Sequence, residues 1–362
     1  MLIGGEAMSD KLKVGILGAT GMVGQRFNTL LENHPWFEVT TLAASKSSAG
    51  KTYEEAVKGR WKMDTPIPEA VKNIVVKDVA DVEDIAKEVD FVFSAVNMSK
   101  EEIKAIEEAY AKTETPVVSN NSAHRWTPDV PMVIPEINPE HYAVIEDQRK
   151  RLGTKKGFIA VKPNCSIQSY TPCLAAWKEF EPTKVVVSTY QAISGAGKTF
   201  KEWPEMVGNI IPLISGEEEK SEQEPLKVFG HIENGEIVKA EGPVISAQCI
   251  RVPVLNGHTA TVSISFKKKP TKEELIDRLN NFKGQPQEFK LPHAPEHFIR
   301  YMEEENRPQV TLDVDYEGGM GVSIGRLRED YIFVYKFLFV LSSRNYYGKK
   351  LVRSYSYLSG AN

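Results

Sequence analysis

Residues 13–24 read KVGILGATGMVG, and they decide the fold of the first half of the chain. Residues 13–17 form a short apolar run, a glycine-rich turn follows over 18–24, and residues 25–31 have helical periodicity. A strand, a glycine turn and a helix in this order let the backbone approach a pyrophosphate, which binds at the helix N-terminus. The GxxGxxG spacing is a variant of the dinucleotide fingerprint. It therefore predicts a dinucleotide site, with a tight turn that binds no ligand as the alternative.

The segments that follow extend this unit into a parallel, doubly wound sheet. Residues 37–44, 90–96 and 115–120 are predicted strands, and the last two are separated by a helix over about 100–112. The loop 121–126 then lies at the carboxyl end of a strand, where ligands bind in such sheets.

The loop after the second predicted strand indicates which dinucleotide binds. An NAD site usually places an aspartate or glutamate there to bind the ribose 2′-hydroxyl. This chain instead has Ser45, Lys46 and Ser48. Hydroxyl and ammonium donors suit a 2′-phosphate, so the loop predicts a preference for NADP; an ordinary solvated loop is the alternative.

Residues 162–166, KPNCS, contain the candidate nucleophile, Cys165. A β-prone run over 158–161 precedes it, and residues 168–177 can form a helix that begins close to the cysteine. Free N–H groups and the helix dipole at such a position stabilise a thiolate. The alternative is a small buried side chain without chemistry. The other two cysteines, Cys173 and Cys249, lie in a helical and a strand-like run, respectively.

The second half of the chain has a different pattern. Residues 184–192, 259–266 and 331–341 are long predicted strands, and a capping box at 271–274 opens a helix that continues to about residue 282. Long strands with few helices predict an α+β domain whose mixed or mostly antiparallel sheet is covered on one face. The acidic run 216–224 is interpreted as a solvated helix start or loop.

These patterns divide the chain into two domains. We predict a disordered extension over 1–10, a nucleotide-binding domain over 11–164 joined by 343–362, and a catalytic and dimerisation domain over 165–342. Residues 345–358 are expected to form a helix that packs back on the first domain. The strands of the second domain need cover on both faces, so we expect a homo-oligomer, either a homodimer or a homotetramer.

Composition excludes several classes of protein. The net charge of −4 shows no basic excess of the kind that nucleic-acid binders carry. No apolar run is long enough for a membrane span, and the N-terminus lacks the features of a signal peptide. Three widely spaced cysteines suit a reducing cytoplasm and do not have the spacing of a zinc site, so we expect a cytoplasmic protein without a metal.

Polar residues that could serve a thiolate are scattered through the second half. Arg251 and His258 lie at the two ends of a turn between predicted strands, and Gln191 ends a strand before a glycine loop. Glu224 and Lys227 are three residues apart, so they can share a helix face. Taken singly, each of these side chains is more often structural or solvated than functional.

Together these motifs resemble aspartate-β-semialdehyde dehydrogenases, and the match follows that family's order along nearly the whole chain. It is carried by five motifs: GATGMVG at 18–24, SAHR at 122–125, PNC at 163–165, YQAISGAG at 190–197 and RVPVLNGH at 251–258. Details at 44–45, 121–125, 210–212 and 216–220 are similar to the branch found in archaea and fungi. One departure is the acidic motif EPLK at 224–227, where a proline interrupts the pattern.

The resemblance implies a fold like that of glyceraldehyde-3-phosphate dehydrogenase and a reversible, NADP-dependent reduction of aspartyl phosphate to aspartate semialdehyde. This reaction serves lysine, threonine and methionine biosynthesis. Cys165 would form the thioester, His258 would be the general acid and base, and Gln191 would orient the substrate.

The resemblance also assigns the binding residues. Arg251 would bind the α-carboxylate and Glu224 the α-amino group, and the phosphate would be held by Arg125, Asn164 and Lys227. The residues expected to bind the cofactor are Gly18, Thr20, Gly21, Met22, Val23, Ser45, Lys46, Ser48, Ser94, Ser194 and Gly195.

Other readings remain open at this point. A malonyl-CoA reductase resembles the same archaeal branch and shares the thioester chemistry, but its substrate has no amino group for Glu224. N-acetyl-glutamyl-phosphate reductase and glyceraldehyde-3-phosphate dehydrogenase share the two-domain plan but fit the five motifs less well. A dinucleotide sensor without catalysis is expected to lack Cys165 or His258, and both are present.

Overall fold

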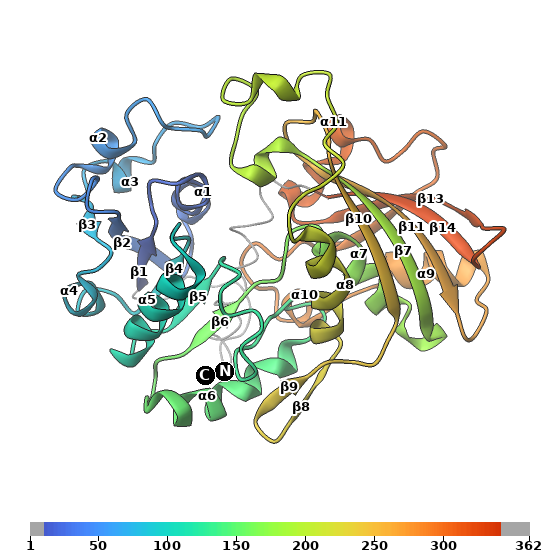
Figure 1. Ribbon diagram of the computed structural model, residues 1–362, viewed down its shortest axis with the longest axis horizontal. Coiled ribbons are helices and arrows are strands. Elements are labelled where there is room, and N and C mark those ends of the chain that lie inside the picture. Colours follow the sequence, from blue (N-terminus) through green and yellow to red (C-terminus); the bar gives the residue numbers. More distant parts are fainter. Residues whose placement is uncertain (1–10, 342–362) are drawn as a thin grey trace.

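The computed structural model describes residues 11–341 and is built on two six-stranded sheets that lie side by side (Figure 1). The predicted extension over 1–10 and the predicted helix over 345–358 lie outside the described residues. The domain boundaries given above therefore stay predictions.

The first sheet is parallel and has the strand order β3-β2-β1-β4-β5-β6. Its strands are β1 (Leu12–Leu17), β2 (Phe37–Ala44), β3 (Lys77–Asp78), β4 (Phe91–Ser94), β5 (Val117–Ser119) and β6 (Ile159–Val161). The helices among them are α1 (Met22–Leu31), α2 (Tyr53–Val57), α3 (Glu69–Lys72), α4 (Val82–Ala86), α5 (Lys100–Lys112) and α6 (Ile145–Leu152), with the 3-10 helix η1 (Pro139–Val144) before α6. Its near-continuous burial is what a parallel sheet covered on both faces requires.

The strand order reverses between β1 and β4, and this is the switch point at which a doubly wound sheet opens a crevice for ligands. The glycine turn lies at this point. Gly18 has φ +81°, and a Cβ placed there would lie 2.3 Å from the carbonyl oxygen of Ala95, so another residue would both strain the turn and clash with the end of β4.

The second sheet is mixed, with the strand order β10-β7-β11-β14-β13-β12. Its strands are β7 (Pro182–Gln191), β10 (Val244–Arg251), β11 (His258–Phe266), β12 (Ile299–Met302), β13 (Val322–Glu329) and β14 (Tyr335–Leu341), and a separate hairpin pairs β8 (His231–Glu233) with β9 (Glu236–Val238). The helices are α7 (Ile167–Ala176), α8 (Glu217–Val228), α9 (Lys272–Asn280), α10 (Gln285–Glu288) and α11 (Val310–Asp313), with the 3-10 helices η2 (Lys178–Phe180), η3 (Ile193–Ala196), η4 (Pro204–Met206) and η5 (Tyr316–Gly319).

The long helices of this domain pack on its sheet: α8 contacts β10, α7 contacts β11 and β14, and α9 contacts β12. Along β11 buried residues alternate with half-buried ones, and in β7 Val186 is exposed between the buried Val185 and Val187. The predicted mixed sheet, well covered on one face, is confirmed.

Two predicted elements differ from what the structure shows. The strand expected from residue 331 begins at Tyr335, because Asp330 accepts hydrogen bonds from the N–H groups of Ile332 and Phe333 and so turns the chain before the strand. The acidic run 216–224, expected to be a solvated helix start or loop, forms the N-terminal part of α8, in which Glu217, Ser221 and Glu224 are buried.

Candidate active site

The candidate nucleophile, Cys165, lies in the short connection between β6 and α7. The Asn164 side-chain oxygen accepts hydrogen bonds from the Ser166 N–H (2.8 Å) and the Ser166 hydroxyl (2.7 Å), which shapes the turn that opens the helix. The Cys165 Sγ lies 3.3 Å from the Nε2 of His258. The cysteine therefore stands directly before a helix, as predicted, and beside a histidine 93 residues further along the chain.

The other two cysteines have no such setting. Cys173 is buried inside α7, and burial raises the pKa of its thiol far above the usual value. Burial also raises the pKa of Cys249, which lies in β10 beside the Ser221 hydroxyl. Only Cys165 among the three lines the cavity described next.

His258 is the first residue of β11, and its partners come from the neighbouring loops. The backbone N–H of Ala192 donates to its Nδ1 at 3.1 Å. Burial, and then the positive charge of Arg251, lower its pKa to about 3; a hydrogen bond to the Gly257 backbone acts in the opposite direction. The ring beside the thiol is therefore neutral at physiological pH.

Arg251 ends β10, next to the strand end that carries Gln191, so the turn between Arg251 and His258 holds both side chains at one edge of the sheet. Its Nη1 donates to the carbonyl oxygen of Ala192 at 2.7 Å. Gly195 packs against both groups: a Cβ there would lie 3.0 Å from the Arg251 Nη1 and 3.0 Å from the His258 ring. The loop after β7 can approach them because this position has no side chain.

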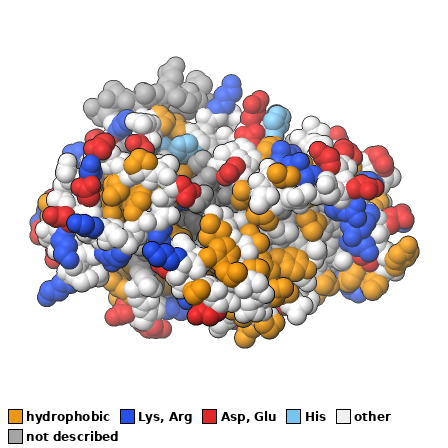
Figure 2. Space-filling model, turned by 90° about the horizontal axis from the view of Figure 1, so that it is seen from above, with side chains coloured by type: hydrophobic (Ala, Val, Ile, Leu, Met, Phe, Trp, Pro, Cys, Tyr) orange, Lys and Arg blue, Asp and Glu red, His pale blue; other side chains and the backbone are white. Residues whose placement is uncertain are grey.

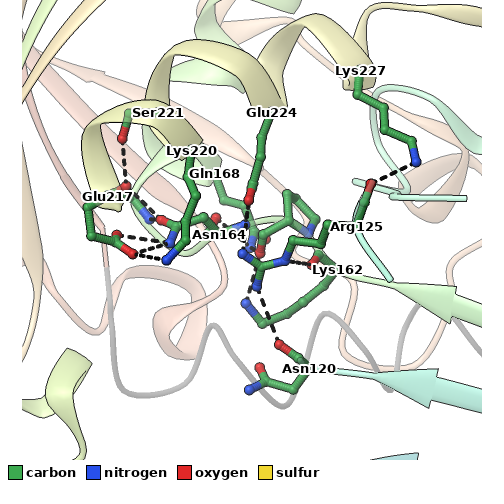
Figure 3. Close-up of polar contacts among 12 residues, drawn as sticks. Asn120, Arg125, Lys162, Asn164, Gln168, Glu217, Lys220, Ser221, Glu224 and Lys227 are labelled. Atoms are coloured by element: carbon green, nitrogen blue, oxygen red, sulfur yellow. Dashed lines mark hydrogen bonds and ion pairs between the residues drawn. The ribbon is translucent and has the colours of Figure 1, made fainter. Parts of the chain in front are cut away.

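A polar cavity opens at Cys165 between the two domains. Its lining includes Arg251 and Gln191 and, from helix α8, Glu217 and Lys220. Figure 3 shows Glu217 and Lys220 beside Asn164. The Lys220 ammonium pairs with the Glu217 carboxylate at 2.8 Å. Burial raises the pKa of Glu217, but Lys220 and hydrogen bonds from Asn164 and Gln191 outweigh it, so the pKa is lowered and the group is ionised.

Glu217 and Lys220 are the functional candidates that the sequence interpretation missed. The acidic run was expected to face solvent, but the Glu217 carboxylate instead accepts two hydrogen bonds from the Asn164 amide, both 2.9 Å. One signal was available in the sequence: Glu217 and Lys220 have the same three-residue spacing as Glu224 and Lys227, without a proline between them.

Glu224 does not lie in the cavity lining, contrary to its predicted role. It is fully buried, and its two oxygens bond to the Arg125 guanidinium (2.9 Å) and to the Asn164 N–H (2.5 Å). The carboxylate therefore holds the loops that carry Arg125 and the nucleophile, and it has no direction in which to meet a substrate ammonium.

Lys227 is likewise outside the lining. Its ammonium donates to the carbonyl oxygens of Arg125 (2.8 Å), Thr127 (3.0 Å) and Val130 (3.0 Å), which accounts for its three protons. Figure 3 shows its side chain directed away from Glu217 and Lys220. Burial lowers its pKa to about 8, and the lysine serves to fix the loop after β5.

The other predicted substrate residues do lie in the lining, namely Arg125, Asn164, Gln191 and Arg251. Arg125 also bonds to the backbone: its Nε donates to the carbonyl oxygen of Lys162 at 3.1 Å and its Nη2 to that of Asn120 at 3.4 Å. The Gln191 amide reaches the Glu217 carboxylate at 3.4 Å. These side chains form one connected network around the thiol.

A second cavity adjoins the first and runs between the glycine turn and the second domain. Its lining includes Met22 and Val23 at the start of α1, and Ser194 and Gly195 after β7, all of which were predicted to bind the cofactor. Helix α1 has no side-chain cap and no acidic residue in its first turn. Its N-terminus is thus suited to an anion such as a pyrophosphate.

The remaining predicted cofactor residues differ in their surroundings. Ser45 and Lys46 are exposed at the end of β2, whereas the Ser48 side chain is buried. Ser94 is also buried; its hydroxyl donates to the Glu107 carboxylate at 2.7 Å. The buried hydroxyls of Ser48 and Ser94 are therefore less available to a ligand than predicted. Gly18, Thr20 and Gly21 lie in the turn before α1.

Lys62 spans the second cavity and was not expected from the sequence. It belongs to the first domain, and its ammonium pairs with Glu202 at 2.8 Å and donates to the Gly197 carbonyl oxygen at 2.8 Å. Both partners belong to the second domain, so this lysine ties the two sides of the groove together.

Residues 11–341 contain neither a candidate metal site nor a helix that could span a membrane. Within this range no cluster of three or more histidine, cysteine, aspartate or glutamate side chains is arranged to hold a metal ion. None of the helices in the same range has the length and apolar character needed to cross a membrane.

Comparison with known proteins identifies the family. Residues 13–145 match the family described as semialdehyde dehydrogenase, NAD binding domain, and residues 173–346 match semialdehyde dehydrogenase, dimerisation domain. The aspartate-semialdehyde dehydrogenase of Methanothermobacter thermautotrophicus is 43% identical over 92% of this chain and 94% of its own. That of Aspergillus fumigatus is 40% identical over 89% of each chain.

Solved structures agree with this result. The crystal structure of aspartate semialdehyde dehydrogenase with NADP from Candida albicans has a TM-score of 0.86 and 35% identity, and the match covers 97% of this chain and 99% of that one. A Vibrio cholerae aspartate semialdehyde dehydrogenase II shares the fold, with a TM-score of 0.74 and 23% identity over 97% of this chain and 99% of that one. This chain belongs to the aspartate-semialdehyde dehydrogenase family, in the company of archaeal and fungal relatives.

Proposed function

We propose that this enzyme catalyses the reversible NADP-dependent reductive dephosphorylation of aspartyl phosphate to aspartate semialdehyde, in the biosynthesis of lysine, threonine and methionine. The observation that carries the proposal is the Cys165–His258 pair, 3.3 Å apart, at a cavity that combines two arginines and two lysines with a carboxylate. Family membership supports the reaction, and it favours the aspartyl substrate over malonyl-CoA.

In the phosphorylating direction, the Cys165 sulfur attacks the aldehyde carbon and forms a thiohemiacetal. Because its Nδ1 accepts the Ala192 N–H, the neutral His258 carries its proton on Nε2, beside the sulfur. The thiol proton goes to water before the attack, and the Nε2–H donates a hydrogen bond to the former carbonyl oxygen as that oxygen gains negative charge. The low pKa of His258 keeps the ring in this neutral, hydrogen-bond-donating form. Phosphate then attacks the thioester carbonyl, the C–S bond breaks, and aspartyl phosphate leaves.

The substrate has two anionic groups and one ammonium, and the cavity supplies partners of both signs. We assign the α-carboxylate to Arg251, whose planar guanidinium can bind it with two hydrogen bonds. The α-ammonium is assigned to Glu217, which is ionised and lines the cavity, in place of Glu224. Lys220 takes the phosphate role first given to Lys227, together with Arg125 and Asn164.

The groove beside the glycine turn fits NADP. The N-terminus of α1 would hold the pyrophosphate, the loop at Ser194 and Gly195 would line the nicotinamide end, and Ser45 and Lys46 would face the 2′-phosphate. When bound, the cofactor supplies a hydride acceptor in one direction and a hydride donor in the other.

A paired assay tests the proposed reaction. Reduction of NADP⁺ is followed with aspartate semialdehyde, with and without phosphate, beside oxidation of NADPH with malonyl-CoA. We expect phosphate-dependent turnover in the first assay. Turnover with malonyl-CoA alone would overturn the assignment of the substrate.

The orientation of the substrate has its own test in Arg251→Lys. This change keeps the charge and loses the planar fork, so we expect the KM for semialdehyde to rise more than the KM for phosphate. An equal rise in both would place Arg251 at the phosphate and reverse the orientation.

We also propose that the enzyme works as a cytoplasmic homodimer or homotetramer. Three free cysteines suit a reducing compartment. Figure 2 shows hydrophobic side chains gathered on the half of the molecule formed by the second domain. Exposed apolar residues there include Val207, Ile210, Leu213 and Val244. Light scattering of the active enzyme at micromolar concentration tests this, and an active monomer would contradict it.

A further inference from the structure

Lys162 is a lysine in the wall of the active-site cavity, and none of the roles assigned above involves it. It follows β6, three residues before the nucleophile, and its side chain is almost completely buried. Its N–H donates to the Ser119 carbonyl oxygen at 3.1 Å, and its own carbonyl accepts from the Arg125 Nε at 3.1 Å. These two hydrogen bonds fix the backbone of Lys162 at the end of the first sheet.

The ammonium of Lys162 lies within the same group of charges as the thiol. Its Nζ donates to the Pro163 carbonyl oxygen at 2.9 Å. Burial and the like charge of Arg125 lower its pKa to about 7, against the opposing effects of Cys165, Glu224 and Glu217. The site thus holds a lysine that a bound anion can bring to the charged state.

The origin of the lining residues separates the cavity into two sides. The second domain supplies Gln191, Glu217, Lys220 and Arg251, and the loops after β5 and β6 supply Asn120, Asn121, Ser122, Arg125, Lys162 and Asn164. The side that comes from the first domain thus consists of amides, a hydroxyl and two cations, which suits a multiply charged oxyanion.

The charges of the lining residues, compared with those of the substrate, indicate which oxyanion binds on this side of the cavity. Four cationic side chains line the cavity, with Glu217 among them, while Glu224 lies buried behind Arg125. With Lys162 protonated, cations exceed these carboxylates by two. Aspartyl phosphate carries one carboxylate, one ammonium and a phosphate of about −1.5 to −2. Its net charge is matched only when Lys162 contributes.

On the basis of the proposed function, we propose that Lys162 is a phosphate-binding residue, which holds the phosphate that attacks the Cys165 thioester and, in the reverse direction, the phosphoryl group of the acyl phosphate. During phosphorolysis a phosphate oxygen bonds to the acyl carbon, the C–S bond breaks, and the thiolate leaves with its electron pair. An ammonium in the lining that also contains Cys165 attracts the entering anion and stabilises the leaving one.

Substitution of Lys162 by methionine and by arginine tests this proposal. In Lys162→Met, which removes the charge and keeps the length, we expect the KM for inorganic phosphate to rise by about tenfold to a hundredfold, as the loss of a charged hydrogen bond predicts. The KM for semialdehyde should change less than about threefold by comparison. Lys162→Arg should recover much of the phosphate affinity, and Lys178→Met, an exposed lysine outside the cavity, is the matched control.

The pH dependence of the KM for phosphate is a second test of the role of Lys162. In the wild type the KM for phosphate should rise above about pH 7 as Lys162 loses its proton, and this rise should be smaller in Lys162→Arg. Phosphate titrates in the same range, but the comparison of the two proteins cancels that effect. The charged and titratable groups around Lys162, namely Arg125, Cys165, Glu217, Glu224, Lys220, Arg251 and His258, are unchanged between them.

Three results would overturn the proposal or the function beneath it. An unchanged KM for phosphate in Lys162→Met would overturn it, provided that NADP⁺ titration shows a folded protein. Slower alkylation of Cys165 by iodoacetamide, with an unaltered KM for phosphate, would instead assign the lysine to the thiolate. Wild-type enzyme without phosphate-dependent turnover would contradict the proposed function itself, which separates the two failures.

Discussion

Two parts of helix α8 compare directly, because Glu217 and Lys220 at its start repeat the residue types and the spacing of Glu224 and Lys227 near its end. The first pair lines the cavity and is partly exposed, with 11% of the Glu217 side chain and 28% of the Lys220 side chain accessible. The second pair is buried and bonds to the protein itself. A charged pair at helical spacing therefore has no fixed role: neighbouring loops decide whether it meets a substrate or supports the site.

The largest expected effect tests whether the cavity at the start of α8 is the place of reaction. Cys165→Ala should abolish turnover while NADP⁺ binding, measured by fluorescence titration, stays intact. Cys173→Ala is the control, because Cys173 is buried inside α7 and does not line the cavity; this variant should retain most activity. Turnover in Cys165→Ala would remove the basis of the comparison, because the acid–lysine pair would then line a cavity without chemistry.

The next effect breaks the buried pair. Glu224→Ala leaves the Arg125 guanidinium buried without its carboxylate, so we expect a loss of about 3–5 kcal/mol in the free energy of unfolding, measured with urea. Glu217→Ala leaves Lys220, which can reach water, and two amides that line the cavity, so its loss should be smaller, about 1–2 kcal/mol. Equal losses in the two variants would show that both pairs are structural.

Substrate affinity should show the opposite order. Glu217→Gln removes the charge that we assign to the substrate ammonium, and we expect the KM for semialdehyde to rise by about tenfold to a hundredfold. The urea midpoint should stay close to that of the wild type. If Glu217→Gln binds the semialdehyde normally, the ammonium meets another group and the assignment fails.

The pH dependence of the free energy of unfolding extends the comparison to a third buried group, His258, which lies beside the nucleophile. The folded-state pKa of His258 is about 3, below its usual value of 6.5, so as the pH falls below 6.5 the unfolded state binds the extra proton first. Stability should therefore fall as pH decreases from about 6.5 towards 3, by at most about 1.4 kcal/mol per pH unit for this group. Folded His258→Asn should have a shallower decline, whereas His231→Asn, at an exposed hairpin position, should follow the wild type.

The smallest effect is expected at the exposed end of the cofactor site. Lys46 is solvent-accessible after β2, so its attraction for a 2′-phosphate is screened by water and salt. Lys46→Ala should lower the preference for NADPH over NADH by up to about fivefold in kcat/KM, and more at low salt. If the preference for NADPH fell by a hundredfold or more, Lys46 would contact the 2′-phosphate in a buried setting like that of the active-site cavity.

How far the sequence predicted the site depends on the distance between the residues that had to be combined. The glycine turn, the strands on either side of it and Cys165 before its helix depend on contacts within a few residues, and the structure has them where the sequence indicated. Arg251 and His258 were also found together, because one turn carries both. Ser48 and Ser94 were predicted at the cofactor from their places in the chain, but their burial depends on the packing around them.

What the sequence determined by itself was the order of strands and helices, the dinucleotide turn, the nucleophile and, through five ordered motifs, the family. These properties follow from local periodicity, glycine geometry and residues close together in the chain. Only the tertiary structure decided that Glu217 and Lys220 line the cavity, that Glu224 and Lys227 support it, and that Lys162 joins the charges around the thiol. The physical reason is that the role of a charged side chain depends on the groups it contacts. The partners of the α8 side chains come from loops about 50 to 100 residues away, which pack against α8 only when both sheets have formed.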